Sequence, residues 1–125
     1  MTDEKHLLRL KYGVWNEWRH ANPGLPVAMD GAKLDGMVLP GIDLSGVSLR
    51  GASMHATNLM NADLSRADLS GANLVEADLI GANLEGAILR GAKLREADLL
   101  GARLTGAEYS REDLEGALHV PAASP

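Results

Sequence analysis

The chain contains no cysteine and no phenylalanine among its 125 residues, and aromatic side chains make up only 3% of it. Without cysteine, neither disulfides nor thiolate chemistry contributes to the fold or to a reaction. The zero cysteine count also suits a reducing compartment. We therefore expect a cytoplasmic protein.

Long apolar runs are missing as well. Residues 1–13, "MTDEKHLLRLKYG", are charged from the start, and their strongly apolar residues are Leu7, Leu8 and Leu10. Such a segment is neither a signal peptide nor a membrane span, so we expect no membrane association. The net charge is −5, with no basic stripe. Direct binding to nucleic acid is therefore not expected.

What the sequence has instead is a period of five. Residues 65–87 read "SRADLSGANLVEADLIGANLEGA", in which leucine and alanine recur every five residues. On a helix this spacing scatters leucine around the cylinder, and on a straight strand it sends leucine to alternate faces. A chain that turns a corner in every pentad keeps each leucine on one side. Four pentads then close a square, and the fifth stacks on the first.

The register runs without a slip from Leu34 to Tyr109, and alanine stands two residues before most of these central positions. With leucine and alanine pointing inward, the tube is narrow and filled, which leaves no lumen for a cofactor. The central residues that we expect to form the core are Leu59, Leu64, Leu69, Leu74, Leu79, Leu84, Leu89, Leu94 and Leu99.

The A(D/N)LXX pattern, as in "ADLSGANLVEADLIGANL", resembles that of the pentapeptide-repeat family over residues 30–109. The resemblance implies an all-β solenoid, a right-handed quadrilateral β-helix of about four coils. We expect three parts. A short α-helical N-terminal cap and lead-in covers 1–29, the β-helix covers 30–109, and a helical turn with a loose tail covers 110–125.

Solenoid ends need caps, because the end coils expose unpaired backbone. Residues 4–20 have apolar residues near helical spacing, with Gly13 as a break between two short helices, and Trp15 and Trp18 should lie on the first coil. A similar WNxWR lead-in precedes the repeats in many family members. At the other end, Ser110 and Asp113 indicate a single capped turn. The weaker closure there leaves open a homodimer formed end to end.

Catalytic and metal-binding patterns are not found. The four histidines lie in different regions without ligand spacing, and the glycines recur as corner residues rather than as a phosphate loop. The outward aspartates before the central leucines are expected to bond to nearby backbone at the turns rather than to hold a cation. The sequence predicts no enzyme activity, no metal and no cofactor.

One outward column differs from the other three when the sequence is folded onto four faces. Pro40, Met60, Ile80 and Leu100 follow one another at the same position of successive coils, with Val75 at the preceding corner and Val38 at the upper edge of the column. A contiguous apolar patch favours a contact site, whereas scattered apolar residues are ordinary. Chance occupancy of a tolerant position is the alternative explanation.

The sequence therefore predicts a non-catalytic interaction or scaffolding module that binds an unidentified protein partner, or a second copy, through its outer faces. Some members of the family bind type II topoisomerases and are proposed to mimic duplex DNA, so a gyrase-binding DNA mimic is the alternative. Against it, outward acids only slightly outnumber outward bases, and the phenylalanines common at central positions of such members are absent.

Overall fold

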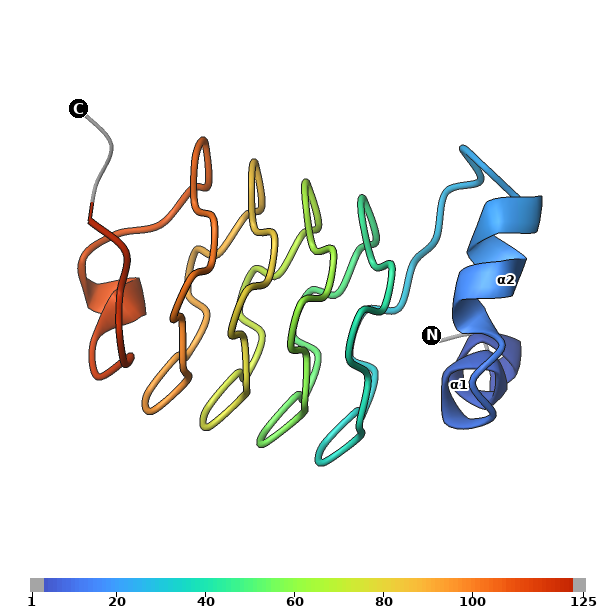
Figure 1. Ribbon diagram of the computed structural model, residues 1–125, viewed down its shortest axis with the longest axis horizontal. Helices are drawn as coiled ribbons and strands as arrows, with labels where there is room; N and C mark the ends of the chain where they lie inside the picture. The colour runs from blue at the N-terminus through green and yellow to red at the C-terminus, as the bar shows by residue number, and fades with distance from the viewer. Residues whose placement is uncertain (1–3, 123–125) are drawn as a thin grey trace.

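The computed structural model describes residues 4–122 and forms a stack of coils (Figure 1). Two helices, α1 (Glu4–Lys11) and α2 (Trp15–Ala21), lie at the N-terminal end of the stack. The short 3-10 helix η1 (Glu112–Leu114) lies at the opposite end. The chain therefore runs through the coils from one end of the stack to the other, so α1 and η1 lie at opposite ends.

Successive coils are joined by parallel bridges between residues 20 positions apart, such as Asp63 with Asn83 and Asn83 with Arg103. Four pentads thus make one coil, as the five-residue period predicts. Within residues 4–122 these bridges are isolated, and no continuous strand forms. The reason is local, because a corner in every pentad leaves room for little more than one paired residue on each side.

The interior is filled by the central leucines and by the alanines two positions earlier. The expected core positions are each at most 1% exposed, namely Leu59, Leu64, Leu69, Leu74, Leu79, Leu84, Leu89, Leu94 and Leu99. Thr57 replaces an alanine at one inward position, and its hydroxyl donates to Leu34 O at 2.8 Å, which satisfies the buried polar group. Each fully buried leucine contributes about 1.5–3 kcal/mol relative to an exposed one.

Every corner places its second residue in the left-handed region of backbone space. Glycine fills most of these positions, as at Gly71, where φ is 68°. Five repeats carry another residue at this corner with φ between 56° and 61°, namely Ala56, Asn61, Arg66, Glu76 and Glu96. Side chains with a Cβ are strained in this conformation, so the corners explain the recurrence of glycine.

The aspartates and asparagines before the central leucines cap the following corner. Asp63 Oδ1 accepts from both the backbone N and the Oγ of Ser65, at 3.0 and 2.6 Å. Asn83 Oδ1 accepts from Glu85 N at 3.0 Å. These side chains therefore serve the local backbone, in the manner of an Asx turn.

The first coil has a free edge, and side chains of α2 take the place of a missing backbone rung. Inside the stack, Leu44 N donates to Asp63 O of the next coil at 2.8 Å. The corresponding carbonyl of the first coil, Asp43 O, accepts from Trp15 Nε1 at 2.6 Å. Asn16 Oδ1 accepts from Asp43 N at 2.8 Å. Two side chains thus reproduce a bridge that no earlier coil supplies.

A third side chain continues this substitute rung at the next corner. Within the stack, Gly46 N donates to Ser65 O at 2.9 Å. One coil earlier, the residue in register is Pro26, which has no N–H to give to Ser45 O. Arg19 donates to that carbonyl instead, at 2.5 Å. The helix therefore covers the edge by hydrogen bonding as well as by apolar packing.

Trp15 is fully buried and Trp18 half-buried, and the rings of both lie against His6 of α1, at centroid distances of 5.3 and 4.8 Å. The Arg9 guanidinium lies 4.2 Å from the Trp18 ring. Gly13, with φ of 74°, separates the two helices at the expected break. Trp15 belongs to the same apolar cluster as the buried residues of the first coil, such as Leu44, and Trp18 packs against this cluster.

The C-terminal end departs from the sequence expectation in two ways. The capped turn forms, since Asp113 Oδ2 accepts from Ser110 N at 2.8 Å. However, pairing extends beyond residue 109, because Leu118 bridges to Asp98. In addition, Tyr109, the last central position of the register, is 37% exposed, whereas the central leucines up to Leu99 are buried. The outermost parts of the predicted cap and tail, residues 1–3 and 123–125, lie outside the described residues.

Candidate functional site

The apolar column is continuous because backbone hydrogen bonds stack its members directly. Gly41 N donates to Met60 O, Asn61 N to Ile80 O and Gly81 N to Leu100 O, each at 2.8 Å. These bonds put residues 20 positions apart in register. Pro40, Met60, Ile80 and Leu100 therefore form one line across the coils.

Exposure along the column is uneven. Val38 is 71% and Leu100 52% exposed, and Pro40 is also exposed, whereas Met60 and Ile80 are half-buried. The structure thus brings these residues to one face, with the most accessible side chains at its two ends. Val75 lies at the preceding corner, on the neighbouring column, where Ala56 N donates to Val75 O at 2.9 Å.

Side-chain amides and carboxylates hold the backbone of this face. Asn58 Oδ1 accepts from Met60 N at 3.0 Å, Asp78 Oδ1 from Ile80 N at 3.0 Å, and Asp98 Oδ1 from Leu100 N at 3.1 Å. In the first coil, Val38 stands in place of the side-chain acceptor, and Pro40, which has no N–H, stands in place of the donor. Neither group is therefore left without a partner. The apolar side chains are therefore presented on a fixed backbone.

The other sides of the stack are mainly polar, and charged side chains on them pair across coils. Arg50 lies 3.8 Å from Asp68, Arg90 3.4 Å from Glu108 and Arg103 3.5 Å from Glu85. Exposed pairs of this kind contribute little to stability. These charged pairs distinguish the other faces from the apolar column, whose outward residues Pro40, Met60, Ile80 and Leu100 are all uncharged.

Two aspartates near the ends of the stack have lowered pKa values. His119 Nδ1 lies 2.9 Å from Asp98 Oδ1, and this hydrogen bond, followed by that from Leu100 N, lowers the pKa of Asp98. The Ser53 hydroxyl, followed by His55 N, lowers the pKa of Asp35 in the same way. These carboxylates tie adjacent segments together.

Neither metal-binding nor membrane-spanning features emerge from residues 4–122. In that range, no three side chains of His, Cys, Asp or Glu come together as metal ligands would. None of the helices in the same range has the length and apolar character needed to cross a bilayer. The four histidines lie apart, with His6 in the cap and His119 near the C-terminal end.

The C-terminal end presents a second apolar area. A cleft of about 610 Å³ there is lined by Tyr109, Leu114, Val120 and Pro121, together with charged residues of η1 and its flanks. Leu114 packs against the core from one side. Leu118 is 45% and Val120 43% exposed, so this end is only partly closed.

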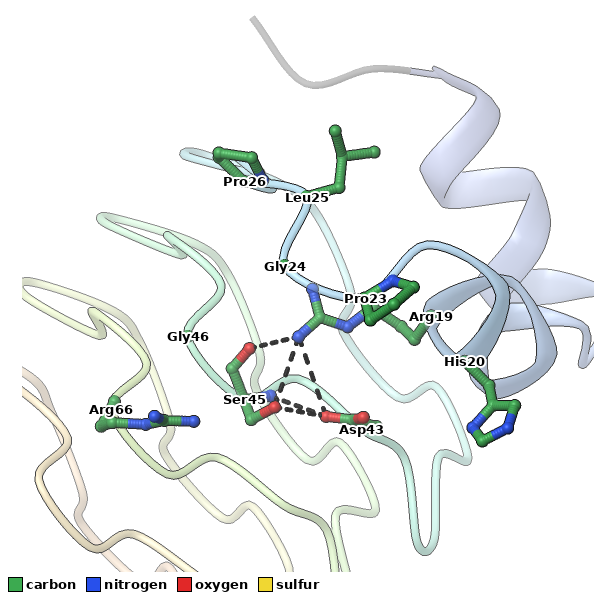
Figure 2. A pocket seen from close by; sticks show the side chains of 10 residues that line it. All are labelled: Arg19, His20, Pro23, Gly24, Leu25, Pro26, Asp43, Ser45, Gly46 and Arg66. Atoms are coloured by element: carbon green, nitrogen blue, oxygen red, sulfur yellow. Dashed lines mark hydrogen bonds and ion pairs between the residues drawn. The ribbon is translucent and has the colours of Figure 1, made fainter.

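A third feature was not predicted from the sequence. A cleft of about 680 Å³ lies between the C-terminal part of α2, the segment 23–26 and the corners of the first two coils (Figure 2). Arg19, Ser45 and Arg66 contribute to its polar side. The only sequence signal was an arginine at a corner position that glycine usually fills.

Comparison with known families identifies the repeat unit. The family model for pentapeptide repeats matches in 8 copies, over residues 29–66, 62–100 and 72–108. The matched region thus coincides with the stacked coils and stops before η1. A search of curated protein sequences finds no significant match.

Among solved structures, a pentapeptide repeat protein of the Arabidopsis thaliana thylakoid lumen is 33% identical over 65% of this chain, with a TM-score of 0.63, and the match spans 57% of that protein. A pentapeptide repeat protein of Nostoc is 32% identical over 85% of this chain and 93% of its own, with a TM-score of 0.47. QnrB1, a plasmid-mediated fluoroquinolone resistance protein, is 15% identical over 68% of this chain and 66% of its own, with a TM-score of 0.33.

Proposed function

Because the chain belongs to the pentapeptide-repeat family, we propose that it is a non-catalytic interaction or scaffolding module that binds a protein partner or a second copy through its outer faces. Members of this family are generally structural or interaction modules rather than enzymes. The filled interior supports the proposal, since the core leucines and alanines leave no internal site for a substrate.

The observation that carries the proposal is the apolar column of Pro40, Met60, Ile80 and Leu100. Backbone hydrogen bonds stack these residues without a break, whereas each of the other outward columns includes charged or hydroxyl side chains. A contiguous apolar strip on a rigid surface is suited to contact with another protein. Val38 extends the strip at its exposed N-terminal end.

The strip is narrow compared with the ~800 Å² that each partner buries in a standard interface. It therefore suits a weak or multivalent contact. For self-association, two surfaces are available, namely the apolar column and the C-terminal end around Tyr109 and Val120.

Two finer features belong to the same proposal. We assign the coils to a right-handed quadrilateral β-helix, which the four-pentad coil and the family both support. We also propose a cytoplasmic location, which the absence of cysteine suits. The Arabidopsis relative is a protein of the thylakoid lumen, so fractionation of the native protein is the direct test of location.

The double variant Ile80→Asp with Leu100→Asp tests the column. Because Leu100 is exposed and Ile80 half-buried, we expect little change in circular dichroism but loss of self-association, measured by light scattering across concentration. Lys93→Ser with Thr105→Asp makes the same change in net charge at exposed positions outside the column and serves as the control. If both variants self-associate equally, and chemical cross-links between copies form at the C-terminal end, the interface lies at that end rather than at the column.

The alternative, a DNA mimic that binds a type II topoisomerase, has a separate test. Several outward aspartates, such as Asp63, are engaged with their own corners rather than arrayed freely. We therefore expect no effect of the protein on gyrase supercoiling. Inhibition or protection of gyrase at stoichiometric concentrations would favour the mimic instead.

A further inference from the structure

The cleft beside the N-terminal cap has two unlike walls. Its polar wall is formed by Arg19, Ser45 and Arg66, and its other wall by Pro23, Leu25 and Pro26 (Figure 2). Leu25 is 49% exposed, although it lies in a chain segment that runs along the molecule. At this edge of the first coil, Asp43 O and Ser45 O accept hydrogen bonds from Trp15 and Arg19 of α2 rather than from segment 23–26. The cleft lies between this segment and the coil.

Arg66 contributes an accessible guanidinium to the polar wall. Its backbone is held in the left-handed region, with φ of 58°, at a corner position that glycine usually occupies. The residues above and below it in the same column are Gly86 and Gly46, so no neighbouring side chain shields it. Figure 2 shows its guanidinium extending toward Ser45. Among residues 4–122 this guanidinium has no hydrogen bond or ion pair.

Arg19 adds to the positive character of the cleft. One of its guanidinium nitrogens donates to Ser45 O, and the same nitrogen lies 3.9 Å from Asp43 Oδ1. The guanidinium has further N–H groups, because it carries five donors. With Arg19, Arg66 and Asp43 as the charged residues of the cleft, the local sum is +1, in a chain of net charge −5.

We propose that this cleft binds an acidic peptide segment, with a carboxylate on Arg66 and an adjoining apolar side chain against Leu25 and the two prolines. The volume falls within the ~300–1,000 Å³ of ordinary ligand sites. A free guanidinium pairs with a carboxylate through two parallel hydrogen bonds. An apolar peptide side chain can pack against the apolar wall, whereas a free inorganic anion makes no such contact.

Nucleic acid does not fit the same observations. A nucleic-acid site requires several cations that follow the phosphates, and here one unpaired guanidinium stands beside a paired one. The site is independent of the apolar column, which is formed by a different set of outward residues. It therefore adds a second contact of different chemistry to the same scaffold.

The test is an NMR titration of the full chain with the peptide Ac-Leu-Glu-Leu-NH2 and its neutral counterpart Ac-Leu-Gln-Leu-NH2. We expect saturable shifts of the Gly24, Ser45 and Gly46 amides with the glutamate peptide and at least about tenfold weaker binding of the glutamine peptide. Arg66→Gly should abolish the shifts, and because glycine suits this corner, the variant stays folded. Arg90→Ser removes a cation from another column and should leave binding unchanged.

Each other outcome overturns the proposal. Equal binding of the two peptides, or binding retained by Arg66→Gly, would show that the guanidinium is not the anchor. Inorganic phosphate that binds as tightly as the glutamate peptide, with no loss of peptide affinity in Leu25→Ser, would identify a general anion site without the apolar wall. These results do not depend on self-association, so they leave the test of the column separate.

Discussion

At the scale of single residues, the repeat places two demands on the sequence. The central position requires a side chain that fills a narrow interior, and the corner requires a backbone that tolerates positive φ. Leucine meets the first and glycine the second. Glu96, at φ of 60°, satisfies the second only with strain, and its corner is exposed. Such positions are expected to be held by the stacked coils around them.

Exchanging residues at two corners tests this reading. Glu96→Gly should raise the free energy of unfolding by about 1 kcal/mol, because the strain of a Cβ at positive φ is removed. Gly71→Ala should lower it by a similar amount, although a Cβ at Gly71 would meet nothing within 4 Å. Urea unfolding of both variants provides the measurement. A Gly71→Ala variant as stable as the wild type would show that steric space, and not φ, governs the corner.

At the scale of elements, α2 acts as a substitute for a coil. The helix is only 7 residues long and has no side-chain cap at its N-terminus, so its stability comes from docking. Trp15, Asn16 and Arg19 each reach the backbone of the first coil. An exposed edge would pair with other chains, and the cap removes that hazard at the N-terminal end.

The two tryptophans allow the hydrogen bond to be separated from packing. Trp15→Phe removes the donor to Asp43 O, whereas Trp18 makes no indole hydrogen bond within residues 4–122. Both changes remove similar ring volume. We expect Trp15→Phe to cost about 1–3 kcal/mol more than Trp18→Phe, because the part-buried Asp43 carbonyl loses its partner and because Trp15, unlike Trp18, is fully buried. Thermal unfolding measures the difference, and equal losses in the two variants would assign the role of Trp15 to packing alone.

At the scale of the whole molecule, each coil contacts its neighbours, so the two ends decide how the stack holds together. Carboxylates with lowered pKa values lie at both ends. The Ser48 and Ser53 hydroxyls lower the pKa of Asp30 and of Asp35, which link the first coil to the second. The backbone N–H of Ser110 lowers the pKa of Asp113, which also accepts from Gly91 N at 3.1 Å.

These shifts predict an acid-sensitive stack. A carboxyl with a lowered folded-state pKa stabilises the native state above its ordinary value of 3.8, and this contribution is lost as the pH falls through the folded-state value. The melting temperature should therefore fall as the pH drops through about 4 and below, and protection against hydrogen exchange should be lost first in the end coils.

Asp35→Asn keeps a side-chain oxygen as acceptor but removes the titration, so its melting temperature should depend less on pH over this range. Glu17→Gln makes the same charge change on the exposed side of α2 and should behave as the wild type. An Asp35→Asn variant with the full acid dependence of the wild type would exclude this carboxyl as a source of the effect.

The sequence alone determined the register, the core from Leu59 to Leu99 and the line from Pro40 to Leu100. A repeat of five makes each inward or outward position recur in the neighbouring coil, so one correct alignment places all of them. Local signals of another kind predicted the break at Gly13 and the capped turn at Ser110, namely helical spacing on either side of a glycine and a Ser-x-x-Asp pair. Periodicity is sufficient here because every coil meets a near-identical coil.

Tertiary structure decided what happens where the period stops. Asn16 and Arg19 bond to a coil edge more than twenty residues away, and no repeat relates them to it. Likewise, Leu118 rejoins the stack after η1 has interrupted the count, and Arg66 meets the cleft only because segment 23–26 leaves the first coil. These contacts depend on how non-repeating segments pack on an edge, which local pattern does not encode.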